Sequence, residues 1–160
     1  MPKLDKEFFA HDPRIVARKL MGMRLVREIK EMGEKYIGII AETGAYQGGN
    51  RDGLRYGPGI IYVPIFQGGH ATLAIGTEKE GTPSVVTIRK VYPVEGITEQ
   101  IKGPGDLARA FKITRDLDKK PIDGDELYII GEPFLVSRVK LISPKDEKMS
   151  ANCLGYYRIM

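Results

Sequence analysis

Residues 60–75 read IIYVPIFQGGHATLAI, and this stretch contains the clearest fold signal in the chain. Two runs of β-branched and aromatic residues, 60–66 and 71–75, flank a short polar segment. Gly68 and Gly69 can adopt the positive φ angles that a tight hairpin turn requires. Pro64 has no backbone N–H donor, so the first run is predicted to lie at a sheet edge or to contain a bulge. The stretch therefore predicts a β-hairpin.

Short strands are predicted on both sides of this hairpin, with few helices between them. Residues 23–29 and 36–41 read as two strands joined by a turn at 31–34, and further strands are predicted at 84–91, 126–130 and 134–142. One short helix is predicted after the N-cap Asp12, stopping at Gly22, and a second after Gly103. The strand at 36–41 is expected to lead, through the stretch AETGAY at 41–46, into a glycine-rich loop at 48–59. These elements predict an α+β class with a largely antiparallel sheet.

The composition bounds the kind of protein. A chain of 160 residues with 42% hydrophobic and 29% charged residues is expected to form a single domain, 1–160, around one core. The lone Cys153 allows no intrachain disulfide, and no Cys/His cluster has the spacing of a metal site, so we expect no metal and no cofactor. With no signal-peptide pattern and no apolar run of transmembrane length, the expected location is cytoplasmic, without membrane association.

The formal net charge of +4 is unevenly distributed. Residues 1–30 hold eight basic side chains against four acidic ones, whereas residues 116–132 are clearly acidic. This asymmetry is compatible with a polyanion that meets one face of the protein, although charge by itself favours an ordinary solvated surface. The acidic segment lacks the ordered ligand spacing of a calcium loop.

Several motifs in the N-terminal two thirds of the chain resemble one enzyme family. In order they are EFF at 7–9, VARKL at 16–20, GMRLVR at 22–27, AETGAY at 41–46, PGIIYV at 58–63, IR at 88–89, PVEG at 93–96 and GPGDLARA at 103–110. This series resembles the alkylpurine (3-methyladenine) DNA glycosylase family. The resemblance covers most of residues 7–113 and becomes weak afterwards, where GYY at 155–157 is similar to the family's last strand.

The resemblance implies a fold and an activity. The implied fold is a single domain with a curved, mostly antiparallel sheet, a protruding β-hairpin and a few short helices, similar to the C-terminal domain of methionyl-tRNA formyltransferase. The implied activity is that of a monofunctional DNA glycosylase. Such an enzyme enters the minor groove of double-stranded DNA, flips an alkylated purine into an aromatic pocket and hydrolyses its N-glycosidic bond with an activated water. The implied partner is DNA, and no protein partner is inferred.

Three residues of this sequence match the family's site. Tyr46 matches a tyrosine of the base pocket, Tyr62 an aromatic residue at the hairpin, and Arg89 the arginine beside the nucleophilic water. Read without the resemblance, the same residues are consistent with two core aromatics and a surface cation at a strand end.

Four positions depart from the family pattern. Gly44 occupies the place of the general base in the family's E-T-E-A-Y motif, so that carboxylate is absent. Pro64 replaces a second stacking tyrosine, and Gln67 replaces the tyrosine that fills the gap left by the flipped base. Ala74 replaces the asparagine that screens out normal guanine. The loop after Tyr46 is also shorter than in the family and lacks its pocket histidine.

Two other carboxylates could substitute for the missing base. Glu42 alternates onto the same side of the strand as Gly44, but it lies one two-residue step, about 6.5 Å, before it, and the family has an acid at this position that is not its general base. Asp52 lies on the glycine-rich loop and could reach into the site. The sequence therefore predicts a weak DNA glycosylase for alkylated purines. The alternatives are a non-catalytic lesion or nucleic-acid binder on the same scaffold and, by analogy of fold alone, an RNA-binding module.

Overall fold

The computed structural model describes residues 2–66, 68–131 and 138–160. Its helices are α1 (Lys6–Phe9), α2 (Pro13–Lys19) and α3 (Pro104–Ala110), with single 3₁₀ turns η1 (Lys30–Met32), η2 (Asp52–Arg55) and η3 (Arg115–Leu117). Its strands are β1 (Arg24–Ile29), β2 (Glu34–Gln47), β3 (Ile61–Tyr62), β4 (Ile65–Phe66), β5 (His70–Ala71), β6 (Leu73–Gly76), β7 (Ser84–Glu95), β8 (Leu127–Ile130), β9 (Val139–Ile142) and β10 (Cys153–Ile159). None of the described helices has the length and apolar character needed to span a membrane.

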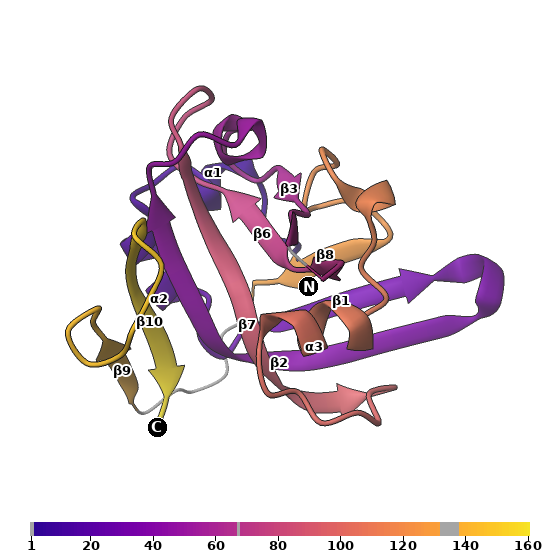
Figure 1. Ribbon diagram of the computed structural model, residues 1–160. Helices are drawn as coiled ribbons and strands as arrows, with labels where there is room; N and C mark the ends of the chain where they lie inside the picture. Colours follow the sequence, from indigo (N-terminus) through magenta and orange to yellow (C-terminus); the bar gives the residue numbers. More distant parts are fainter. Residues whose placement is uncertain (1, 67, 132–137) are drawn as a thin grey trace.

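The long strand β2 organises the sheet (Figure 1). Along one edge it pairs with β7. Along the other edge its first half pairs with β1 and its second half with β10. The strand order across the sheet is β3-β6-β7-β2-β1-β8, and all of these strand pairs, as well as the pair β2–β10, are antiparallel. The predicted α+β class with a curved antiparallel sheet is confirmed.

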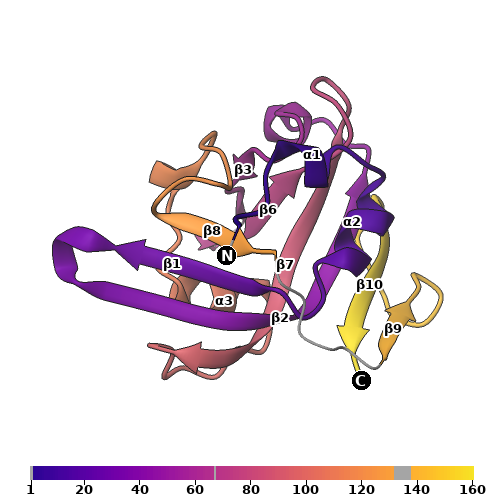
Figure 2. The ribbon, with the colours of Figure 1, turned by 180° about the vertical axis from the view of Figure 1, so that it is seen from behind.

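Helix α2 covers one face of the sheet, and Figure 2 shows this face with the helix in front. The helix begins as predicted, because Asp12 caps it by accepting a hydrogen bond from the backbone N–H of Arg14, and Pro13 occupies the first turn. Thr43 of β2 donates its hydroxyl to the carbonyl of Ala17 on α2, at 2.8 Å. Because side chains alternate along a strand, Thr43 and its neighbours at every second position face the helix.

The stretch AETGAY lies inside a strand, which corrects the expectation that the strand ends at Ala41. β2 continues to Gln47 because both of its edges are paired there, with β7 on one side and β10 on the other. The partner β10 is more than a hundred residues away in the sequence, so no local pattern could signal the extension. The site residues of this stretch are therefore held by a sheet and not by a loop.

The predicted hairpin at 60–75 has two parts. Its base, β3 and β6, belongs to the main sheet, and its outer part, β4 and β5, forms a separate two-stranded ribbon. The break falls at Val63 and Pro64, as the missing N–H of proline requires. Gly68 and Gly69 have φ angles of 91° and 80° at the turn, in agreement with the prediction.

Candidate active site

One row of paired residues crosses the sheet on the face opposite α2. Gly44 of β2 pairs with Thr87 of β7 on one side and with Tyr156 of β10 on the other. Thr87 pairs in turn with Ala74 of β6, and Ala74 with Tyr62 of β3. Directly opposed residues in antiparallel strands project from the same face. The sheet therefore brings Gly44, Ala74 and Tyr62 together in one row, although the sequence separates them.

Tyr46 and Glu42 flank Gly44 on the same face, two positions away on either side. Tyr46 is half-buried and contacts two apolar clusters, one around Tyr62 and Ala74 and the other around Cys153 and Tyr156. Burial raises the pKa of the Tyr46 phenol well above its ordinary value of 10.0, so this side chain keeps its proton even in alkaline solution. A neutral phenol ring is suited to contacts with a flat aromatic base.

Gly44 is tightly enclosed. A Cβ atom added at this position would lie 2.8 Å from Oγ1 of Thr87, 2.9 Å from Cε1 of Tyr46 and 3.2 Å from Cδ1 of Tyr156. Two of these distances are shorter than a carbon atom normally tolerates. The two tyrosine rings thus close over the backbone where a longer side chain would project.

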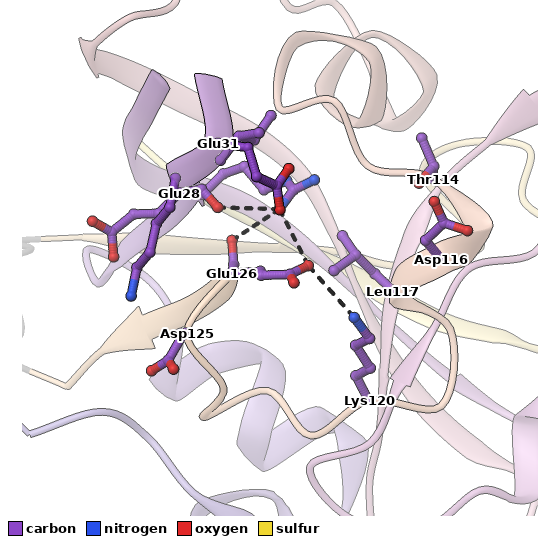
Figure 3. A pocket seen from close by; sticks show the side chains of 11 residues that line it. Glu28, Glu31, Thr114, Asp116, Leu117, Lys120, Asp125 and Glu126 are labelled. Carbon is purple, nitrogen blue, oxygen red and sulfur yellow. Dashed lines mark hydrogen bonds and ion pairs between the residues drawn. The ribbon is translucent and has the colours of Figure 1, made fainter. Parts of the chain in front are cut away.

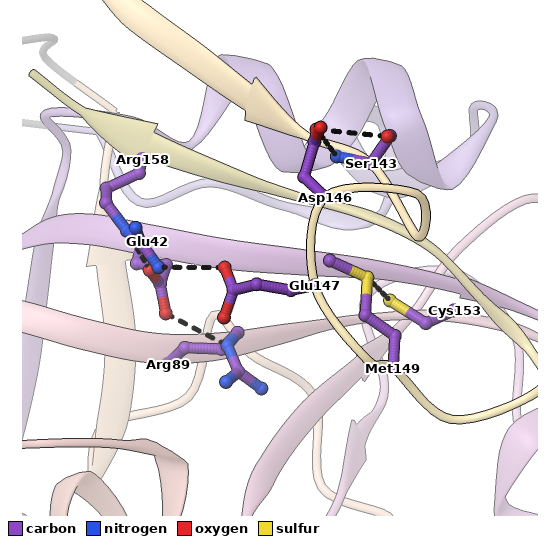
Figure 4. Close-up of polar contacts among 8 residues, drawn as sticks. All are labelled: Glu42, Arg89, Ser143, Asp146, Glu147, Met149, Cys153 and Arg158. Atoms are coloured by element: carbon purple, nitrogen blue, oxygen red, sulfur yellow. Dashed lines mark hydrogen bonds and ion pairs between the residues drawn. The ribbon is translucent and has the colours of Figure 1, made fainter.

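Glu42 is buried, with 1% of its side chain exposed, and is held by two arginines (Figure 4). Its Oε2 accepts a hydrogen bond from Nε of Arg89 at 3.0 Å, and its Oε1 accepts one from Nε of Arg158. Arg158 also forms an ion pair with Glu147, at 3.7 Å. Because each carboxylate oxygen bonds a guanidinium group, the geometry is that of an anchor and does not favour Glu42 as a substitute general base.

Arg89 is the residue that this anchor positions. Beside it, the register between β2 and β7 shifts, so that Glu42 pairs with Lys90 and Thr43 with Ile88. Such bulges redirect side chains and are common next to active sites. The guanidinium carbon of Arg89 lies 3.7 Å from the ring centroid of Tyr156, and 18% of the side chain is exposed. Arg89 is therefore not a free surface cation but a fixed charge at the edge of the row.

Tyr62 is packed beneath the turn η2. Only 6% of it is exposed, and a Cβ atom on Gly53 would lie 2.1 Å from its ring, so only glycine permits this approach. Its ring meets that of Tyr56 edge to face, with centroids 5.6 Å apart. Asp118 fixes the arrangement by accepting hydrogen bonds from the Tyr56 hydroxyl at 2.7 Å and from the backbone N–H of Val63 at 2.8 Å. Burial, followed by the hydrogen bond to Asp118, raises the pKa of Tyr56 to about 12.

The other predicted site residues occupy varied environments. Asp52 is exposed at the start of η2, directly before Gly53. Ala74 and Pro64 are buried. Gln67 lies outside the described residues. Its neighbour Phe66 is 45% exposed on β4, and the guanidinium carbon of Arg51 lies 4.8 Å from the Phe66 ring centroid. The ribbon thus carries an exposed aromatic ring next to a cation.

A cavity of about 450 Å³ lies elsewhere, beside β1 and η3 (Figure 3). Its wall includes Arg27, whose guanidinium donates hydrogen bonds to the backbone carbonyls of Phe111, Lys112 and Glu126. Arg27 thereby joins β1 to the segment after α3, which is a structural role. Among the described residues, no group of three or more His, Cys, Asp or Glu side chains is arranged to hold a metal ion.

Comparison with known proteins identifies the family of the chain. Residues 7–144 match the family described as methylpurine-DNA glycosylase. The chain belongs to this family. The match extends beyond residue 113, after which the sequence motifs resemble the methylpurine-DNA glycosylase family only weakly, and it includes η3, β8 and β9.

Bacterial relatives provisionally named 3-methyladenine DNA glycosylase are similar over most of their length. One from Anaeromyxobacter sp. (strain Fw109-5) is 37% identical, with 82% of this chain and 74% of the relative aligned. One from Desulfitobacterium hafniense (strain Y51) is 34% identical, with 82% and 81% aligned. One from Legionella pneumophila (strain Lens) is 33% identical, with 84% and 79% aligned. The family match over residues 7–144 includes every residue of the row described above except Tyr156 of β10.

Sequence reasoning missed three residues of this face: Thr87, Tyr156 and Arg158. Tyr156 lies in the GYY motif, which indicated a final strand but not its position beside Gly44. Thr87 immediately precedes the IR motif at 88–89, and alternation along the strand places it on the same face as Arg89. That alternation was a usable signal. The pairing of Arg158 with Glu42 had none.

Proposed function

We propose that this protein is a DNA N-glycosylase that hydrolyses the bond between deoxyribose and an alkylated purine. The observation that carries the proposal is the fixed Arg89, anchored by buried Glu42 and stacked on Tyr156, on the same sheet face as Tyr46. Membership of the methylpurine-DNA glycosylase family and the names of the relatives support it. In this role Arg89 orients the attacking water, and Tyr46 contacts the flipped base.

The substrate follows from the residue at position 44. Gly44 has no carboxylate, and both oxygens of Glu42 are bound by arginines, so the E-T-G-A-Y motif provides no general base for the water's proton. Loss of a positioned general base costs about 10²- to 10⁴-fold in rate. A purine methylated at N3 or N7 carries a positive charge, so its bond to C1′ breaks without protonation and the base leaves neutral. A neutral lesion such as hypoxanthine lacks this advantage. We therefore propose cationic 3- and 7-methylpurines as the substrates.

The ribbon β4–β5 supplies the contact with DNA in this proposal. Proteins that kink duplex DNA from the minor groove insert apolar side chains between base steps. Phe66 is an exposed aromatic residue next to the turn of the ribbon, with Arg51 beside its ring. Phe66 is accordingly assigned the wedge role for which the resemblance indicates position 67.

A second function, lesion binding without hydrolysis, is favoured by the enclosure of Gly44. The rings of Tyr46 and Tyr156 occupy the space into which a longer side chain at residue 44 would extend. A scaffold closed in this way retains DNA contacts but activates water poorly. The two functions differ in one measurable quantity, the release of free base.

Base release from three duplexes tests the proposal. The duplexes contain 3-methyladenine, 7-methylguanine or hypoxanthine, and the wild-type protein is compared with Arg89→Ala and Arg89→Lys. We expect release of both methylpurines, little release of hypoxanthine, and loss of release in Arg89→Ala with partial retention in Arg89→Lys. Salt-dependent binding by all three proteins without any free base would establish the binding function instead.

A further inference from the structure

The segment 115–120, which contains η3, lies along the outer edge of β3, the last strand on its side of the main sheet (Figure 1). At Ile61 the contact is between backbones. The N–H of Ile61 donates to the carbonyl of Lys120, and the N–H of Lys119 donates to the carbonyl of Ile61, both at 2.8 Å. Covering an edge strand in this way satisfies backbone groups that would otherwise be unpaired.

Val63, two residues further along, is held by side chains of the same segment. Its N–H donates to Oδ1 of Asp118 at 2.8 Å, and its carbonyl accepts a hydrogen bond from Nη1 of Arg115 at 2.7 Å. Nη2 of Arg115 also lies 3.6 Å from Oδ2 of Asp118, whose side chain is only 5% exposed. We call this pair the Arg115–Asp118 clamp. It binds both backbone polar groups of Val63 with charged partners, which form stronger hydrogen bonds than neutral ones.

The clamp acts where the main sheet gives way to the ribbon β4–β5. Val63 is fully buried, and the next residue, Pro64, has no N–H to continue the strand pairing. Directly after Pro64 the side chains become exposed, 43% for Ile65 and 45% for Phe66. The clamp therefore holds the last residue before the chain leaves the body of the protein.

Lys119, the residue after Asp118, adopts a backbone conformation that is uncommon for any residue other than glycine. Its φ angle is 72°. Such conformations cost free energy and persist only where the surrounding structure fixes them, often at functional sites. Here the hydrogen bond from Lys119 to Ile61 and the neighbouring clamp on Val63 fix the segment on both sides. The geometry of this segment is thus coupled to the base of the ribbon.

We propose that Arg115 and Asp118 are positioning residues that hold the ribbon β4–β5 in the orientation in which it enters DNA, an inference that rests on the proposed glycosylase function. In this role neither residue contacts DNA. They fix Val63, which sets the direction of the chain through Pro64 and so the place of the Phe66 ring. Without the clamp the ribbon keeps its own strand pairing but pivots about residues 63 and 64, so the ring is less often aligned with the minor groove.

Hydrogen–deuterium exchange of the free protein tests the clamp. In Arg115→Ala, peptides covering β4 and β5 should exchange about two- to tenfold faster than in the wild type, which corresponds to the loss of one hydrogen bond. Peptides of the β1–β2 hairpin should be unchanged. Arg14→Ala is the matched control, because Arg14 is 56% exposed, against 55% for Arg115, and also pairs with one aspartate, but lies on α2. Unchanged exchange in the ribbon, or equal acceleration in the β1–β2 hairpin, would overturn the clamp.

DNA binding provides the second readout, with a duplex that carries a tetrahydrofuran nucleotide, which has no base to release. Arg115→Ala should weaken binding about two- to tenfold in the wild type but cause no further loss in Phe66→Ala, because both changes act through the same ring. The dependence of affinity on salt should be unaltered. A direct phosphate contact by Arg115 would instead lower the salt slope by about 0.9 and act independently of Phe66→Ala.

Either of these two results would overturn the positioning role of Arg115. Absence of duplex binding by the wild type would count against the glycosylase proposal itself. Hydrogen–deuterium exchange would then still decide whether the clamp holds the ribbon, because it is measured on the protein without DNA.

Discussion

At the scale of single residues, the space around Gly44 limits which side chains position 44 can carry. Replacing it with alanine places a methyl group within 3 Å of Thr87 and Tyr46. Such overpacking costs about 1–3 kcal/mol, so we expect Gly44→Ala to lower the free energy of unfolding by this amount in urea titrations. Gly105→Ala is the matched control, because a Cβ atom there meets nothing within 4 Å. If Gly44→Ala is as stable as the wild type, the rings of Tyr46 and Tyr156 move aside freely. Gly44→Glu would then be worth testing for a gain in base release.

Glu42 provides a second prediction at this scale. Removing one partner of a buried ion pair leaves the other charge uncompensated, at a cost of about 3–5 kcal/mol. Because Arg158 is 39% exposed, we expect Glu42→Gln to lose stability near the lower limit of that range. It should also reduce base release, since Arg89 loses its anchor. Glu99→Gln is the control, because its ion pair with Arg109 is exposed and worth about 0–1 kcal/mol. Equal losses in both variants would refute the anchor.

At the scale of elements, the ribbon β4–β5 projects from the hairpin apart from the main sheet. If Phe66 stacks between bases, truncating it removes at least about 1 kcal/mol of binding, or about fivefold in affinity. Phe66→Ala should therefore bind duplex DNA at least that much more weakly in fluorescence anisotropy. Tyr92→Ala is the control, because Tyr92 is similarly exposed, at 52%, but lies on β7. A larger effect of Tyr92→Ala would move the DNA-binding surface away from the ribbon.

At the scale of the whole molecule, buried ionisable groups make the fold sensitive to alkali. Burial is the main cause of the raised pKa values of Cys153, Tyr46, Tyr128 and Tyr157. In the unfolded chain these groups ionise near their ordinary pKa values of 9.0 for cysteine and 10.0 for tyrosine. The folded protein keeps their protons, so its stability is complete below about pH 9 and decreases as the pH rises further.

Urea unfolding at pH 8 and pH 10.5 measures this effect. The wild-type free energy of unfolding should be lower at pH 10.5, and Tyr46→Phe should show a smaller decrease, because it removes one of these groups. A pH dependence identical in Tyr46→Phe and wild type would show that the Tyr46 phenol does not contribute.

By itself, the sequence determined the hairpins, the start of α2 and the order of family motifs, because capping, alternation and turn chemistry depend on residues close together in the chain. It also identified Tyr46, Tyr62 and Arg89 as candidates and located the missing carboxylate at Gly44. Only the tertiary structure decided the full length of β2, the enclosure of Gly44 by Tyr156 and the capture of Glu42 by Arg158. Glu42 and Arg158 are 116 residues apart, and such a contact depends on which strands become neighbours in the sheet, a property that no local pattern encodes.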